Sequence, residues 1–156
     1  MEPLTQFAVA LAAVLQSAFP SITLNGGSTA VTAAWEPQPD VAMEDAALDT
    51  PAIWTIGMAE TLAAEKGCGT EEFSLLVILQ CKIQPADPKT QISALGLLAS
   101  QIARTCRPLD PEEAFILNTS YADAICTKVV RNPATNLKEL REGLFYSEIL
   151  TAWKIC

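Results

Sequence analysis

The longest apolar run in the chain lies at residues 73–83, FSLLVILQCKI. Alternate positions of this run place one apolar set on a single face: Phe73, Leu75, Val77, Leu79, Cys81 and Ile83. Leu76 and Ile78 make the middle of the opposite face apolar as well. A strand that is apolar on both faces is typical of the centre of a sheet, so we predict a central strand covered on both sides.

A helix is predicted directly after this strand. Asp87 is a suitable N-cap, and Pro88 follows at the first helical position, where its missing N–H costs nothing. The core stripe of this helix comprises Ile92, Leu95, Leu98, Ala99 and Ile102. Arg104 and Arg107 end it, next to the negative end of the helix dipole. A strand leading into an amphipathic helix indicates a mixed α and β fold.

The first part of the chain predicts a helix and a hairpin. Apolar residues recur at helical spacing from residue 4 to residue 18, and Pro20 disfavours continuation. Strands at Ser21–Leu24 and Thr29–Trp35 flank Asn25-Gly26-Gly27, which is a strong turn signal. We expect these two strands to pair as a hairpin.

The remaining segments predict a short strand at Ala52–Ile56 and a helix at Met58–Lys66 that ends at Gly67-Cys68-Gly69, because Ala, Leu and Glu favour helices. Further strands are expected at Ala114–Leu117, Ala124–Val130 and Leu144–Ile155. In the last of these, residues 145, 147, 149, 151, 153 and 155 share one face. A helical turn is expected after Asn132-Pro133. The overall prediction is an α+β fold, a mainly antiparallel sheet packed against two main helices, as a single domain over residues 1–156.

Residues 36–51, EPQPDVAMEDAALDTP, form an acidic segment without regular periodicity. We interpret it as a surface loop or an extended arm. The whole chain carries a net charge of −8, which opposes tight nucleic-acid binding because phosphate contacts need clustered Lys and Arg. A negative wall would instead let a DNA strand slide past without adhering.

The high apolar content, 50% of residues, suggests that some apolar surface faces other subunits. An apolar segment near the N-terminus follows Met1, Glu2 and Pro3 rather than a basic region, so we expect no signal peptide. No run reaches the length of a membrane span. We expect a protein made in the cytoplasm.

The sequence contains no histidine, so Ser-His and Cys-His catalytic pairs cannot be built, and no catalytic, cofactor-binding or metal-binding residues are predicted. The carboxylate pairs at 44–45, 71–72 and 112–113 are interpreted as solvated surface. Asp40, Glu44, Asp45 and Asp49 lack the spacing of a calcium loop.

Five cysteines, at positions 68, 81, 106, 126 and 156, show no CxxC spacing and are expected to be free thiols, mostly buried. Cys68 lies between two glycines near Lys66, which leaves a reactive thiol as an alternative to an incidental loop cysteine. Trp35, Trp54 and Trp153 are interpreted as packing residues of the core or of a subunit interface rather than as ligand platforms.

Four segments together resemble the tail terminator and tail-completion proteins of tailed bacteriophages. They are LAAVLQSAFPSITL at 11–24, FSLLVILQCKIQ at 73–84, QISALGLLASQIA at 91–103 and GLFYSEILTAWKI at 143–155. The resemblance covers most of the chain as an order of elements and includes no catalytic motif. It implies a compact α/β subunit that forms a hexameric ring, caps the tail tube and joins the tail to the head.

The partners implied by the resemblance are further copies of the chain, the tail-tube protein and head-tail connector or neck proteins, with DNA only passing through the channel. The location implied is the virion, reached by assembly in the host cytoplasm. A neck connector or tail-tube component of the same particle is one alternative. A small thiol enzyme using Cys68 and an adaptor domain that forms no ring are two others.

Overall fold

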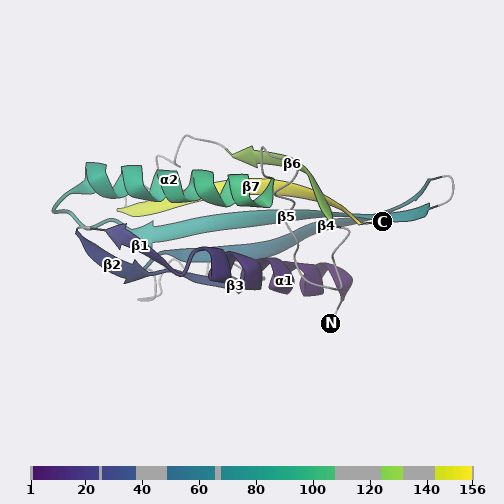
Figure 1. The fold of residues 1–156 in the computed structure, drawn as a ribbon, viewed down its shortest axis with the longest axis horizontal. Coiled ribbons are helices and arrows are strands. Elements are labelled where there is room, and N and C mark those ends of the chain that lie inside the picture. Colours follow the sequence, from purple (N-terminus) through teal and green to yellow (C-terminus); the bar gives the residue numbers. More distant parts are fainter. Residues whose placement is uncertain are drawn as a thin grey trace.

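The computed structural model describes residues 2–24, 26–37, 49–65, 68–107, 124–131 and 143–155 (Figure 1). Its helices are α1 (Pro3–Ala18) and α2 (Pro88–Cys106). Its strands are β1 (Ser21–Leu24), β2 (Gly27–Ala30), β3 (Thr32–Trp35), β4 (Ala52–Glu65), β5 (Cys68–Lys82), β6 (Ile125–Arg131) and β7 (Leu144–Ile155).

The main sheet has five strands in the order β3-β4-β5-β7-β6. Among the described strands of this sheet only the β3–β4 pair is parallel, and the other three pairs are antiparallel. A separate two-stranded antiparallel sheet joins β1 and β2. The fold is therefore α+β with a mainly antiparallel sheet, as the sequence predicts, and β5 lies at the centre of that sheet.

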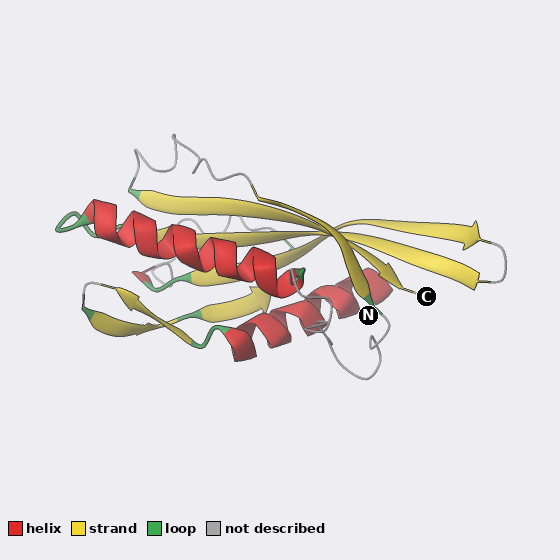
Figure 2. Ribbon diagram, turned by 45° about the horizontal axis from the view of Figure 1, so that its top comes forward, coloured by secondary structure: helices red, strands yellow, loops and turns green. Residues whose placement is uncertain are grey.

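Both helices pack on the same face of the five-stranded sheet (Figure 2). Helix α1 lies over β3 and β4, where the Thr55 hydroxyl donates a 2.7 Å hydrogen bond to the carbonyl of Ala8. Helix α2 lies over β6 and β7, and the Arg131 guanidinium donates a 3.1 Å bond to the carbonyl of Gly96. We call this side of the sheet the helix face and the opposite side the open face.

The core fills the space between the two helices and the helix face. At its centre the ring of Phe7 from α1 lies 5.3 Å from that of Phe73 and 5.2 Å from that of Trp153, between centroids. Such tilted and edge-on pairs add to the energy of simple area burial. The predicted stripe of α2 is confirmed, since Leu95, Leu98, Ala99 and Ile102 are buried and Ile92 packs against them.

The predicted cap of α2 is also confirmed. Asp87 accepts a hydrogen bond from the Thr90 backbone N–H, and Pro88 occupies the start of the helix. Gln91, 2% exposed, bonds both the N–H and the carbonyl of Gln84 and thereby fastens the turn before the helix.

The hairpin prediction is correct for β1 and β2 but wrong in extending the second strand to Trp35. The chain leaves the small sheet at Val31, which is buried, and continues as β3 in the main sheet. Gln16 of α1 holds the chain at this crossing from the small sheet to the main sheet, which we call the β2–β3 crossing. Its side-chain amide donates to the Val31 carbonyl (2.7 Å) and accepts from the Ala33 N–H (2.9 Å).

The predicted helix at Met58–Lys66 is wrong. Residues 52–65 form one long strand, β4, which pairs with β5 as far as the Glu65–Cys68 pair, with a bulge between Gly57 and Ala59. Cross-strand pairing outweighs the helix propensity of Ala, Leu and Glu, which is a weak local preference. Strand β5 accordingly begins at Cys68, five residues before the predicted start at Phe73.

Strand β7 has the predicted bounds, and the predicted face of the strand points into the core, where Phe145, Ile149 and Trp153 are buried. Strand β6 begins and ends one residue later than predicted. The strand predicted at 114–117 and the helical turn predicted after Asn132-Pro133 lie outside the described residues.

Candidate functional site

The open face of the sheet carries several large apolar side chains that neither described helix covers. Exposed examples lie near the β6 edge: Leu150 is 50%, Val130 44% and Ile125 66% exposed. Val130 and Leu150 are direct cross-strand neighbours, and Ile125 pairs with Lys154 on the same face. Exposed apolar side chains gathered on one face mark interaction surfaces more often than isolated ones do.

Lysines accompany these apolar groups. Lys128, which is exposed, pairs with Ala152 between the Val130–Leu150 and Ile125–Lys154 pairs. We call Ile125, Lys128, Val130 and Leu150 the β6–β7 patch. The neighbouring carboxylate on this face of β7, Glu148, accepts a 2.8 Å hydrogen bond from the Tyr146 hydroxyl.

The centre of the open face is better covered. Ile78 is fully buried, and Gln80 beside it is also 0% exposed. The Trp54 indole N–H donates a 2.8 Å hydrogen bond to the Gln80 Oε1 atom across the β4–β5 pair. Among the residues that the structure describes, the Gln80 Nε2 atom has no hydrogen-bond partner, and leaving a buried donor unpaired is costly.

A second surface is the far end of the β4–β5 hairpin, which extends beyond the other strands (Figures 1 and 2). Strand β3 stops pairing with β4 at Thr55, so β4 is the edge of the sheet from there on, and β7 stops pairing with β5 at Glu71, so among the described strands only two remain beyond the Leu62–Glu71 pair. Its side chains include Met58, 56% exposed, and Leu62, 72% exposed. We call residues 58–65 and 68–72 the arm.

The arm is acidic where its side chains are described. Glu60 and Glu72 are exposed and Glu71 is half-buried, and no basic side chain accompanies them among residues 58–62 and 71–72. Leu62 and Glu71 are cross-strand partners. The arm thus combines exposed apolar groups with carboxylates, whereas the β6–β7 patch combines exposed apolar groups with a lysine.

The three tryptophans lie in different environments. Trp153 is 1% exposed in the core, and its indole N–H donates to the Thr151 hydroxyl at 2.8 Å. Trp54 is half-buried on the open face, and Trp35 is 37% exposed on edge strand β3. The prediction of core packing is therefore confirmed for Trp153, whereas an interface role for Trp35 and Trp54 remains a prediction.

Cys81, Cys106 and Cys126 are free and buried, as expected. Burial raises the pKa of the Cys81 thiol to about 11, with a smaller contribution from the negative charge of Asp49. Burial likewise raises the pKa of Cys106 to about 12 and that of Cys126 to about 11. These thiols stay protonated at neutral pH, so none of the three is poised for nucleophilic chemistry.

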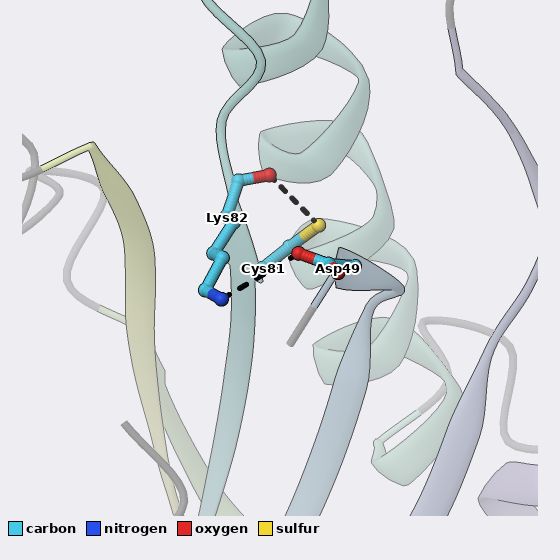
Figure 3. A network of polar contacts seen from close by, with 3 residues as sticks. All are labelled: Asp49, Cys81 and Lys82. Atoms are coloured by element: carbon cyan, nitrogen blue, oxygen red, sulfur yellow. Dashed lines mark hydrogen bonds and ion pairs between the residues drawn. The ribbon is translucent and has the colours of Figure 1, made fainter. Parts of the chain in front are cut away.

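Figure 3 shows the polar contacts around Cys81. Its Sγ atom lies 3.3 Å from the Lys82 carbonyl oxygen, to which it donates, and the Lys82 Nζ atom lies 3.5 Å from the Asp49 Oδ1 atom. This ion pair is solvent-exposed on both sides and joins the start of β4 to the end of β5. Such exposed pairs stabilise a fold only slightly, so this contact joins the two strand ends without adding much to stability.

The other sequence candidates are not brought together. Asp40, Glu44 and Asp45 of the acidic segment and the 112–113 pair lie outside the described residues, as does Lys66, and only the backbone of Cys68 is described. Among the described residues no three His, Cys, Asp or Glu side chains are placed to hold a metal ion. Glu71 and Glu72 lie at the root of the arm and point to opposite faces of β5.

The sequence interpretation missed the arm because it assigned Met58–Lys66 to a helix. One signal could have revealed it: Gly67 lies between two segments of similar length, and a short connection containing glycine is typical of a hairpin. No protein-family model matches the chain, and no curated protein is significantly similar to it. Neither described helix is long and apolar enough to cross a membrane.

Proposed function

We propose that the protein is a structural virion protein that forms a ring, caps the tail tube of a tailed bacteriophage and joins the tail to the head or neck. The observation that carries the proposal is the distribution of apolar surface. Both helices cover one face of the sheet, while the β6–β7 patch and the arm expose large apolar side chains. A subunit of a head-to-tail ring needs two such surfaces, one for each neighbour.

The charge of the chain supports the second part of the proposal. A net charge of −8 per copy gives a ring of several copies a strongly negative field. A negative channel wall repels the phosphates of passing DNA and so prevents adhesion. In this proposal the DNA passes through the centre, the ring is a homo-hexamer, and the neighbouring components are the tail-tube protein and the neck or connector proteins.

The first test is the mass of the purified protein by light scattering, with negative-stain imaging of the same sample. Rings of about six copies support the proposal, because the implied hexamer is closed. Purified tail tubes that lack their terminal ring are then added, and binding to one end of each tube is the expected result. A protein that stays monomeric on its own and does not bind the tubes refutes the proposal and favours an adaptor domain.

A deletion test addresses the acidic segment. Removing residues 38–48 should leave a folded subunit that no longer joins to tubes, because this segment is proposed to contact the adjoining ring. Normal joining by the deletion variant would show that the segment is an ordinary surface loop. The thiol-enzyme alternative predicts rapid alkylation of Cys68 with loss of activity, whereas the proposed function predicts that alkylation leaves tube binding unchanged.

A further inference from the structure

We propose that the arm of one copy docks on the β6–β7 patch of a second copy, so that the chains join head to tail. The inference rests on the proposed function, because it names the contact that would build the ring. It is carried by two surfaces of the same molecule that complement each other in charge and in apolar character.

The arm needs a partner for its exposed apolar groups. Beyond the Leu62–Glu71 pair the described hairpin has two strands, and a two-stranded hairpin on its own is marginally stable in water. Leu62 lies where this part begins and Met58 lies on the edge strand that leads to it, each with more than half of its side chain exposed. Covering them with apolar surface of another molecule removes them from water, which stabilises both the arm and the contact.

The β6–β7 patch offers the matching surface. Ile125, Val130 and Leu150 supply apolar area, and Lys128 supplies positive charge between them. Glu60 of the arm lies two residues from Leu62, so an apolar contact at Leu62 brings its carboxylate near Lys128. Opposite charges at the rim of an interface orient the partners and raise the rate of association.

The contact must be made between copies. In the sheet order, β5 and β7 separate β4 from β6, and the arm extends away from the rest of the sheet (Figure 2). Strand β6 also has a bulge between Cys126 and Lys128, and bulges and lysines on an edge strand hinder the addition of a further strand. The docking therefore uses side chains of the open face rather than main-chain pairing along β6.

A contact between two different surfaces is heterologous, so a pair of copies retains one free patch on the copy whose arm is docked and one free arm on the other copy. This property permits a decisive test with two variants. The arm variant is Glu60→Lys with Leu62→Ser, and the patch variant is Ile125→Ser with Lys128→Ser. All four residues are exposed, so each variant is expected to fold, and circular dichroism and thermal unfolding are measured first to check this.

Each variant alone should associate about tenfold or more weakly than the wild type, as measured by sedimentation velocity over a concentration series. An equimolar mixture should form a discrete dimer, in which the intact arm of the patch variant binds the intact patch of the arm variant. The matched control is Leu97→Ser on α2, where the leucine is 61% exposed, and it should associate like the wild type.

Three results would overturn the arm contact: a wild type that is monomeric throughout the series, variants that assemble like the wild type, or a patch variant that still dimerises while the arm variant does not. The last result would indicate an arm-to-arm contact. Rings that persist in both variants refute the arm contact and leave the proposed function standing. The opposite result is a discrete dimer in the mixture together with wild-type chains that form open assemblies and do not bind tail tubes. That result supports the arm contact and refutes the ring.

Discussion

Gln16 gives the sharpest test of how this fold is specified. Its half-buried amide bonds the Val31 carbonyl and the Ala33 N–H at the point where the chain passes from the small sheet into the main one. Replacing Gln16 with leucine keeps a similar volume but removes both hydrogen bonds, which leaves the Val31 carbonyl and the Ala33 N–H without this partner. Each lost hydrogen bond costs about 0.5–1.5 kcal/mol, so the free energy of unfolding should fall by about 1–3 kcal/mol.

The assay is chemical denaturation followed by tryptophan fluorescence, with Gln101→Leu as the matched control. Gln101 is an exposed glutamine on α2, so its replacement should change the free energy of unfolding by less than about 0.5 kcal/mol. If Gln16→Leu is as stable as its control, the Gln16 amide does not stabilise the crossing from β2 to β3, and this explanation of the crossing is refuted.

A glutamate at position 16 adds a pH test of the same bonds. The ionised carboxylate still accepts from the Ala33 N–H but repels the Val31 carbonyl, whereas the protonated acid can donate to that carbonyl. The folded state therefore raises the pKa of the new carboxyl above its unfolded value of about 4.3. The stability deficit of Gln16→Glu should be smallest below that value and should grow as the pH rises through the folded pKa. A deficit that does not change with pH would refute the proposed geometry.

Further substitutions test the core and the thiols. Leu95→Asp, at a fully buried position, should lower the free energy of unfolding by at least about 3 kcal/mol. The control Leu97→Asp, at an exposed position of the same helix, should leave the protein folded. A folded, soluble Leu95→Asp protein would refute the assignment of Leu95 to the core. Gly57→Ala should cost about 1–3 kcal/mol in urea denaturation, since the added Cβ would lie 2.7 Å from the Leu4 Cγ atom; unchanged stability would mean that the start of α1 shifts freely. Burial raises the pKa of Cys106 from 9.0 to about 12, so the native stability attached to this thiol is complete below pH 9 and is lost as the pH rises toward 12. Peptide mapping after iodoacetamide treatment at pH 8 should find Cys106 unmodified in the native protein and modified in urea, and rapid native modification would contradict its burial.

The pattern of apolar residues predicts much of this fold, because apolar side chains are the ones that are buried and their spacing reveals the element that buries them. The period of 2 in residues 144–155 identifies β7 and both of its faces, and the period of 3.6 after Asp87 identifies α2 and its core stripe. These elements owe their stability to packing one apolar face, so their own sequence contains the signal. The class of fold follows from them, although the strand order does not.

Polar residues that hold the fold are invisible to the same reasoning. Gln16, Gln80 and Gln91 are half-buried or buried, and each bonds a partner that becomes adjacent only after folding. A glutamine in a sequence favours the surface, because most glutamines lie there. The crossing of the chain from β2 in the small sheet to β3 in the main sheet was therefore not predictable, since it depends on a side chain of α1.

The arm shows what happens where local preference and tertiary structure disagree. Residues 58–65 contain mainly helix-forming residues, yet they form a strand that pairs with β5 and, beyond Glu71, with no third strand. Natural sequences are mostly consistent with their fold at the local level, and conflicts are expected at functional or strained sites, which is in keeping with the contact proposed for the arm. The same segment exposes Met58 and Leu62 and carries Glu60, which is the combination that the β6–β7 patch complements. The proposed contact would give the failed helix prediction a physical cause, because a segment that docks on a partner is selected for that contact rather than for its local helix preference.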